Sequence, residues 1–141
     1  MKLFTFLTGL LVAAAGASAE APQPPEDLVI DKTYVPEDCP VKSANGDTIR
    51  VHYTGTLFSN GNKFDSSHDR NSPLPLRLGA GQVISGWEKG LQDMCLNEKR
   101  TLTIPAKMAY GPRGFGSVIP PNSALVFDVE LVGLDKGHTE L

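Results

Sequence analysis

The residues of this chain that could support chemistry are aromatic and apolar, and their spacing suggests a pocket rather than a nucleophilic centre. The only tryptophan, Trp87, lies one turn inside a predicted helix, and the apolar residues Val83 and Ile84 come just before that helix. Such a grouping fits either a dry binding pocket or a core residue that anchors the helix to a sheet. Spacing alone favours the anchor, so the rest of the chain must decide between the two.

A short helix is predicted to begin at Ser85, because Ser85 and Glu88 have the spacing of a capping box. Trp87, Leu91 and Met94 follow at i, i+4 and i+7, which places them on one apolar face. This face must be buried against another element.

A second group of aromatic and apolar residues lies in a long loop over residues 107–123, which is rich in glycine and proline. It contains Tyr110, Phe115, Val118 and Ile119. A loop of this length is more often functional than a simple connection. The alternative is that its apolar side chains only cap the open end of the sheet.

Other kinds of active site find little support in the sequence. The carboxylate Asp65 precedes two serines, where aspartate is an ordinary turn former, and no second carboxylate is placed to make a carbohydrate hydrolase with it. The three histidines and two cysteines show no metal-ligand spacing. The chain also lacks a nucleophile elbow and a phosphate-binding loop. We therefore expect no metal and no cofactor.

The elements that must position these residues are mostly strands. Alternating or β-branched runs predict strands at residues 28–35, 48–57, 63–65, 74–78, 99–105 and 124–132. Over residues 48–57, Ile49, Val51 and Tyr53 share one face. Because a lone amphipathic helix needs a sheet to cover it, the predicted fold class is α+β, an antiparallel sheet of about five strands curled around one short α-helix.

The two ends of the chain indicate the secretory pathway. Residues 1–19 have the charge, the apolar run and the small-residue cleavage site of a signal peptide, and residues 20–27 form a Pro-rich leader that we expect to be disordered. Residues 28–136 are predicted to be one domain. The tail, residues 137–141, ends in His138-Thr139-Glu140-Leu141 and resembles a retention signal of the endoplasmic reticulum lumen, from which Thr139 departs.

The charge composition argues against some classes of binding partner. The net charge is −3, and it becomes −4 if the segment carrying Lys2 is removed. The chain has no basic stripe, so we expect no nucleic acid partner and no membrane contact after signal removal. Cys39 and Cys95 favour one structural disulfide in an oxidising compartment, although two free thiols remain an alternative.

Five segments of the chain, in this order and with matching gaps, resemble the FKBP family of peptidyl-prolyl isomerases. The resemblance spans roughly residues 41–135, nearly all of the predicted domain, and the small disulfide-bearing members of the endoplasmic reticulum are the most similar. The segments are Val51-His52-Tyr53-Thr54-Gly55, Lys63-Phe64-Asp65-Ser66-Ser67, Gln82-Val83-Ile84-Ser85-Gly86-Trp87, Ala109-Tyr110-Gly111 and Leu125-Val126-Phe127-Asp128-Val129-Glu130-Leu131.

The resemblance implies a site made of aromatic residues. The Trp87 ring would form the floor of the pocket, and Phe64 and Phe127 the walls around a proline ring. The Ile84 N–H and the Tyr110 hydroxyl would donate hydrogen bonds to carbonyl groups. The implied catalytic set is Tyr53, Phe64, Asp65, Trp87, Tyr110 and Phe127, and the implied binding set is Arg70, Leu74, Gln82, Val83, Ile84, Phe115, Val118 and Ile119.

Four of these positions depart from common family residues. Leu74 stands where many members have Phe, Gln82 where some have Glu, Phe115 where some have His, and Val118 where Ile is frequent. All four are expected at the rim, so ligand affinity and substrate preference are the properties they put in question.

The implied partners are proline-containing polypeptides and macrolides such as tacrolimus and rapamycin, bound by a monomer. The implied activity is peptidyl-prolyl cis–trans isomerisation during protein folding, without a cofactor. The alternative is a binding module that holds a proline-containing loop of a partner in the same cavity without useful turnover.

Overall fold

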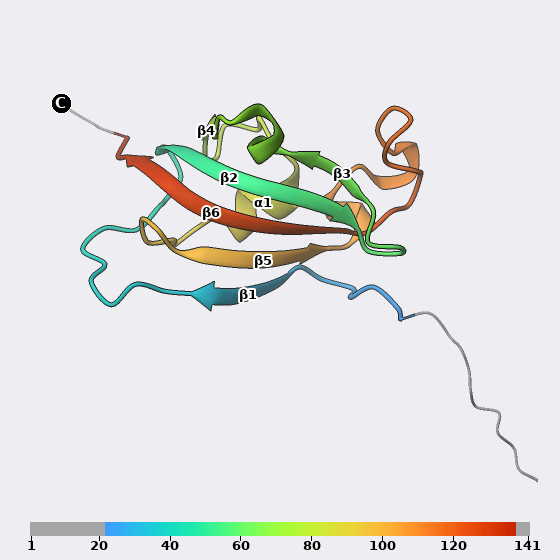
Figure 1. The fold of residues 1–141 in the computed structure, drawn as a ribbon, viewed down its shortest axis with the longest axis horizontal. Coiled ribbons are helices and arrows are strands. Elements are labelled where there is room, and N and C mark those ends of the chain that lie inside the picture. The colour runs from blue at the N-terminus through green and yellow to red at the C-terminus, as the bar shows by residue number, and fades with distance from the viewer. Residues whose placement is uncertain (1–21, 138–141) are drawn as a thin grey trace, which may run out of the picture.

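The computed structural model describes residues 22–137. The predicted signal peptide and the last four residues of the predicted retention tail lie outside the described residues. Within them the chain forms six strands and one α-helix (Figure 1). The elements are β1 (Val29–Tyr34), β2 (Thr48–Leu57), β3 (Lys63–Ser66), β4 (Leu74–Arg77), α1 (Ser85–Gly90), β5 (Lys99–Ile104) and β6 (Leu125–Asp135), with 3-10 turns η2 (Ser67–Arg70), η3 (Ala106–Met108) and η4 (Gly111–Arg113).

The predicted α+β class and antiparallel sheet are confirmed, with six strands where about five were expected. The strands pair in the order β1-β5-β6-β2-β3, and β4 pairs with β2 on the same side as β3. The β2–β6 pair is the longest, because it runs from Thr48 opposite Asp135 to Leu57 opposite Leu125. Strand β2 is therefore central, with neighbours along both of its edges.

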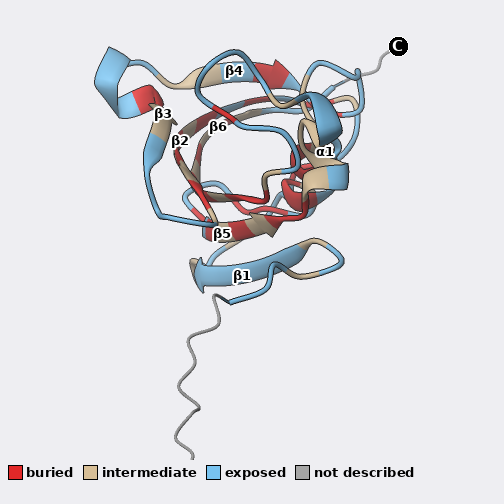
Figure 2. Ribbon diagram, turned by 90° about the vertical axis from the view of Figure 1, so that its right-hand side faces the viewer, coloured by how far each residue is buried: buried red, intermediate tan, exposed pale blue. Residues whose placement is uncertain are grey.

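The core lies on the concave side of the sheet, as the alternation predicted. Ile49, Val51 and Tyr53 of β2 are buried, while the residues between them face outward. In Figure 2 the buried residues line the inner side of the curved sheet, and α1 closes its open side. Trp87 of the helix is also buried, as are Leu91 and Met94, which follow the end of the helix at Gly90.

Two glycines let α1 approach β5 closely. A Cβ at Gly86 would lie 2.5 Å from Cγ2 of Ile104, and a Cβ at Gly90 would lie 2.7 Å from Cδ1 of Leu102. Since real Cβ atoms do not come this close to other atoms, any side chain at either position would push the helix outward. Trp87 keeps its depth because these two positions carry no side chain.

The predicted helix starts at Ser85, but the predicted capping box is wrong. The residue at the N-cap position is Ile84, and no side chain caps the helix. The Ser85 hydroxyl donates instead to the carbonyl of Met108 at 3.3 Å. The Glu88 carboxylate accepts hydrogen bonds from Gly79 and Gly81. Both side chains of the predicted capping box therefore form hydrogen bonds to backbone groups outside the helix instead of to the first turn of the helix.

Strand β1 is an edge strand, and every one of its residues is exposed, including Val29 and Ile30. It pairs with β5 alone. Just after it, Cys39 forms a disulfide with Cys95, with Cα atoms 5.5 Å apart. The disulfide links the segment after β1 to the segment after α1.

Two clusters of hydrogen-bonded polar side chains hold the start of β5 and the start of β2 in place. The first is centred on Arg100 and the second on Asp47. The buried Arg100 guanidinium donates to Glu98 at 2.7 Å and to the carbonyls of Gly90, Gln92 and Asp93 at 2.8–2.9 Å. These bonds tie the end of α1 to β5.

The second cluster holds the last described residues. The Asp47 carboxylate is 4% exposed and accepts hydrogen bonds from Lys136 at 2.6 Å, from the Gly137 N–H at 2.8 Å and from the Ala44 N–H at 2.9 Å. Burial raises the pKa of Asp47, but the hydrogen bonds from Lys136 and the two backbone N–H groups outweigh it, and the pKa falls below its ordinary value.

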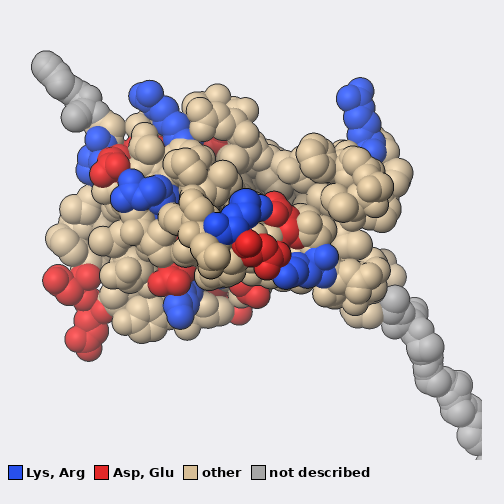
Figure 3. Space-filling view, turned by 45° about the horizontal axis from the view of Figure 1, so that its top comes forward, with Lys and Arg blue, Asp and Glu red and all other residues tan. Residues whose placement is uncertain are grey.

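Acidic and basic side chains are interspersed on the face shown in Figure 3, and neither sign forms a continuous patch there. Across residues 22–137, no helix has the length and apolar character needed to cross a bilayer.

Candidate active site

A small pocket lies on the concave side, between α1, the sheet and the long loop. Its volume is about 140 Å³. Since pockets for drug-sized ligands usually exceed about 300 Å³, this one holds a group the size of a single side chain. It is lined by Tyr53, Phe64, Asp65, Leu74, Gln82, Val83, Ile84, Trp87, Tyr110 and Phe127.

The floor of the pocket is the Trp87 indole, which is 4% exposed. The rings of Tyr53 and Phe127 each meet it edge to face with centroids 5.1 Å apart, at 80° and 81°. Phe64 meets Phe127 in the same way at 5.6 Å. These T-shaped contacts hold the rings in fixed orientations. The indole N–H is buried without a hydrogen-bond partner among residues 22–137.

Gly55 on β2 makes room for the two phenylalanine rings. It pairs with Phe127 of β6 on one side and with Asp65 of β3 on the other. A Cβ at this position would lie 2.6 Å from Cζ of Phe64 and 2.7 Å from Cε1 of Phe127. The rings can therefore lie over the strand only because the residue beneath them has no side chain.

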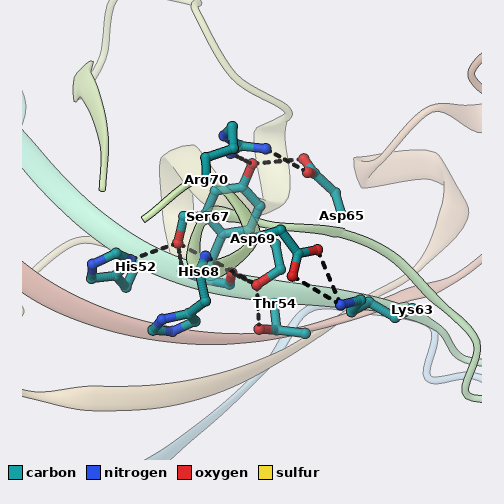
Figure 4. A network of polar contacts seen from close by, with 10 residues as sticks. His52, Thr54, Lys63, Asp65, Ser67, His68, Asp69 and Arg70 are labelled. Carbon is teal, nitrogen blue, oxygen red and sulfur yellow. Dashed lines mark hydrogen bonds and ion pairs between the residues drawn. The ribbon is translucent and has the colours of Figure 1, made fainter. Parts of the chain in front are cut away.

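The polar edge of the pocket is a triad of Tyr53, Asp65 and Arg70. Figure 4 shows the Arg70 and Asp65 side chains turned toward one another. The Tyr53 hydroxyl donates to Asp65 at 2.6 Å. The Arg70 guanidinium donates to Asp65 and to the Tyr53 oxygen, both at 2.8 Å. The three side chains come from β2, β3 and η2, and each one contacts the other two.

The triad sets the ionisation of its members. Burial raises the pKa of Asp65, but the hydrogen bonds from Tyr53 and Arg70 outweigh it and lower the pKa below its ordinary value. Burial, together with the hydrogen bond to Asp65, raises the pKa of Tyr53. The hydrogen bonds to Asp65 and Tyr53 raise the pKa of Arg70. At neutral pH the triad is therefore a carboxylate, a phenol and a guanidinium.

The turn that carries Arg70 is held against β2 by two serines. The buried Ser67 hydroxyl accepts a hydrogen bond from the Tyr53 N–H at 2.8 Å and contacts Nδ1 of His52 at 2.8 Å. The Ser66 hydroxyl donates to the Tyr53 carbonyl at 3.1 Å and caps η2 by accepting from the His68 N–H. Both serines thus bind the backbone of the residue whose phenol closes the triad.

On its far side the pocket continues into a second hollow of about 120 Å³ under the long loop. Phe64, Asp65 and Tyr110 line both cavities. Phe115, which is 57% exposed, lies with its ring centroid 5.0 Å from that of Tyr110. Burial, and then the charge of Asp65, raise the pKa of the Tyr110 phenol, which stays protonated at neutral pH. The second hollow is lined by Phe64, Asp65, Tyr110, Phe115, Val118 and Ile119.

Besides the Trp87 indole N–H, the two donors that the family resemblance implied have no partner within residues 22–137. One is the Tyr110 hydroxyl. The other is the Ile84 N–H, although the Ile84 carbonyl accepts from the Trp87 and Glu88 N–H groups at 2.9 and 3.1 Å. Unpaired donors beside an apolar pocket can bind the carbonyl oxygens of a ligand.

The structure brings all of the sequence-predicted site residues to this one region. The six implied catalytic residues line the first pocket together with Leu74, Gln82, Val83 and Ile84. Phe115, Val118 and Ile119 line the second, and Arg70 binds Asp65 and Tyr53 at the pocket edge. The Gln82 side chain accepts a hydrogen bond from the Arg77 N–H at 3.0 Å. Sequence reasoning missed the supporting roles of Gly55, Ser67 and Glu88; only Gly55 gave a signal, as a glycine inside a strand.

The arrangement is suited to binding and not to bond cleavage. Asp65 is the one carboxylate among the lining residues, and both of its oxygens are occupied by Tyr53 and Arg70. No group of three or more His, Cys, Asp or Glu side chains within the described range could hold a metal ion.

Comparison with known proteins gives one consistent result. A sequence model of the family described as FKBP-type peptidyl-prolyl cis-trans isomerase matches residues 39–132. A Dictyostelium discoideum protein named FK506-binding protein 2 is 48% identical over 135 residues, covering 96% of this chain and 100% of the relative. An Aspergillus oryzae protein of the same name is 50% identical over 132 residues, covering 94% of this chain and 93% of the relative. The crystal structure of AtFKBP13 superposes with a TM-score of 0.69 at 38% identity, covering 82% of this chain and 98% of that one.

Proposed function

The chain belongs to the FKBP-type peptidyl-prolyl cis-trans isomerase family, and we propose that it speeds the rotation of Xaa-Pro bonds in folding secretory proteins. The observation that carries this proposal is the pocket itself, a cage of aromatic rings with two unpaired donors at its edge. Its volume suits one proline ring. Slow Xaa-Pro isomerisation limits the folding of many proteins, which gives the activity its use.

The pocket favours the twisted amide over the planar one. Rotation must break amide resonance, with a barrier of about 18–20 kcal/mol. Resonance places negative charge on oxygen and positive charge on nitrogen, so the planar amide is the more polar form. The rings of Phe64, Trp87 and Phe127 offer it no polar partner, which raises the energy of the planar form relative to the twisted one.

The two unpaired donors then act on the carbonyl groups of the substrate. The Ile84 N–H and the Tyr110 hydroxyl would bind carbonyl oxygens on either side of the proline ring and hold the backbone while the bond turns. The Tyr53–Asp65–Arg70 triad keeps the Tyr53 ring against Trp87 and places the Asp65 carboxylate, paired with the Arg70 guanidinium, at the pocket edge. No covalent intermediate is needed.

The same pocket is proposed to bind macrolides of the tacrolimus (FK506) and rapamycin type. The shared name of the relatives supports this, as does the second hollow beside the first, since a macrolide is far larger than one ring. Leu74, Phe115 and Val118 lie at the rim, where such a ligand would make its outer contacts, so these residues set its affinity.

The endoplasmic reticulum lumen is the proposed location. Residues 1–19 have the pattern of a signal peptide, residues 138–141 resemble a retention signal, and the Cys39–Cys95 disulfide suits an oxidising compartment. A fluorescent protein inserted after residue 27 should colocalise with a lumenal marker. Deleting residues 138–141 should release the fusion into the medium, whereas Thr139→Asp should retain it at least as well as the native tail.

The test of activity is a protease-coupled assay on a short Xaa-Pro peptide at 10 °C, repeated with tacrolimus and with rapamycin. We expect catalysed rates that either macrolide abolishes at a stoichiometric amount. Rates equal to those of the uncatalysed control, together with tight macrolide binding, would instead identify a binding module that holds proline-containing loops without turnover.

A further inference from the structure

Glu88 lies next to the floor residue Trp87 but outside the pocket, and its carboxylate is bound to the turn that precedes α1. Oε1 accepts a hydrogen bond from the Gly79 N–H at 2.6 Å, and Oε2 accepts one from the Gly81 N–H at 2.9 Å. The side chain is half-buried. Hydrogen bonds from backbone N–H groups to an ionised carboxylate are stronger than those between neutral groups.

The turn is shaped to receive an anion. Gly79 and Gly81 have φ values of +83° and +74°, a backbone region that glycine enters freely and other residues rarely do. Backbone N–H groups that point into one concavity form an anion-binding nest. Here the anion is the carboxylate of the protein's own Glu88.

The clamped turn leads directly into the pocket wall. Its beginning is fixed by backbone bonds of 2.9 Å between Leu78 and the Gly46–Asp47 pair. Its end continues through Gln82 to Val83 and Ile84, which line the pocket. The Glu88 side chain ties this turn to α1, the same helix that carries Trp87.

We propose that Glu88 is a positioning residue for the isomerase reaction, which sets the distance between the Val83–Ile84 wall and the Trp87 floor. The inference rests on the proposed isomerase function. Through Gly79 and Gly81 the carboxylate fixes the turn, and the turn fixes the direction of the unpaired Ile84 N–H. Without the clamp, that donor and the Val83 side chain would no longer have one fixed place relative to the proline ring.

The charge and both oxygens matter, which gives a graded series of variants. Glu88→Gln keeps the shape but turns an amide NH₂ toward one of the two N–H donors, so one hydrogen bond is lost. Glu88→Ala loses both. We expect kcat/KM to fall about three-fold in Glu88→Gln and about ten-fold in Glu88→Ala, because the wall loses its fixed position while the rest of the pocket stays intact.

The matched control is Lys89→Gln, which changes one charge on the same helical turn at an exposed residue and should keep the wild-type kcat/KM.

Gly81→Ala disturbs the clamp from the side of the turn that donates the hydrogen bond. A Cβ there would meet no atom within 4 Å, so its effect comes only from the positive φ. It should lower kcat/KM by about as much as Glu88→Gln.

Amide hydrogen exchange gives a readout that does not depend on activity. The Gly79 and Gly81 N–H groups should exchange slowly in the wild type and in Lys89→Gln, and at least ten-fold faster in Glu88→Ala, with Val83 and Ile84 changing as well. Wild-type kcat/KM in both Glu88 variants, or faster exchange confined to Gly79 and Gly81, would overturn the inference. An inactive wild type would overturn the proposed function instead, and the exchange data would still show whether Glu88 holds the wall.

Discussion

The Tyr53 hydroxyl and the Asp65 carboxylate, on neighbouring strands, share a 2.6 Å hydrogen bond that Arg70 reinforces by binding both residues. The bond holds the Tyr53 ring edge to face on Trp87. The lowered pKa of Asp65 means that the carboxylate is ionised at neutral pH. Both of its oxygens already accept hydrogen bonds, one from Tyr53 and one from Arg70. Its role is therefore to orient the phenol and not to move protons.

Asp65→Asn should lower kcat/KM only a few-fold, because the amide oxygen can still accept from Tyr53 or Arg70. The protease-coupled assay measures this directly. Tyr53→Phe, which removes the other end of the bond, serves as the comparison and should give a loss of similar size. A loss of a thousand-fold in Asp65→Asn would mean that the carboxylate takes part in the chemistry.

Gly55→Ala should damage the pocket without breaking the sheet. The added methyl group would collide with the rings of Phe64 and Phe127, and overpacking of this kind costs about 1–3 kcal/mol. We expect kcat/KM to fall at least ten-fold. Thr56→Ala, on the outward face of the same strand, is the control and should keep its activity. A fully active Gly55→Ala variant would show that the rings are not held by this strand.

Asp47→Asn should lower the free energy of unfolding by about 2 kcal/mol at pH 7, because the amide cannot accept from all three donors. The folded state lowers the pKa of Asp47. The stabilisation is therefore complete above the unfolded-state pKa, about 3.9, and is lost as the pH falls through the lower folded-state value.

Urea unfolding at pH 7, 5 and 3 checks this prediction. The difference in free energy of unfolding between wild type and Asp47→Asn should be the same at pH 7 and 5 and should become smaller at pH 3. Asp135→Asn is the control: its ion pair with Arg50 is exposed, so its effect should stay below about 1 kcal/mol. A difference in free energy of unfolding that grows in acid would contradict the lowered pKa of Asp47 in the folded state.

Removing the disulfide should lower stability but leave the activity intact. Cys39 and Cys95 are 56 positions apart, and the loop-entropy model gives such a closure about 4 kcal/mol. Urea unfolding of Cys39→Ala/Cys95→Ala, and of the wild type with dithiothreitol, should show matching losses. Neither cysteine lines the pocket, so kcat/KM at 10 °C should change less than two-fold. A gain of activity on reduction would point to a redox role.

Much of the fold could be predicted because the strands have clear alternation. Strand β2 has the predicted bounds, and Ile49, Val51 and Tyr53 share its buried face as expected. The inward side of β4 was also predicted from its leucines, of which Leu76 is buried. The pairing order could not be predicted, because alternation says which face is buried and not which strand lies alongside.

The capping box failed for a physical reason. Ser85 and Glu88 have the right spacing, but both side chains form longer-range hydrogen bonds, to Met108 and to the glycine turn. A local pattern cannot indicate a partner that only the folded chain brings near. The same holds for Ser67, whose hydroxyl binds the Tyr53 backbone across two elements. The aromatic site residues were found from their resemblance to a family, and their alternation alone did not distinguish a pocket from a core.

The pairing of β2 with β6 means that the pocket stays incomplete until β6 has been synthesised. Phe127 stands opposite Gly55, and the partners Thr48 and Asp135 are among the most distant in the sheet. Contacts so far apart in sequence close late, because a long loop must be ordered first. A nascent chain still missing β6 on the ribosome has Tyr53 and Trp87 but lacks one wall of its cavity. Catalytic competence should therefore arise only when β6 pairs with β2, which makes recovered turnover a sensitive reporter of complete refolding.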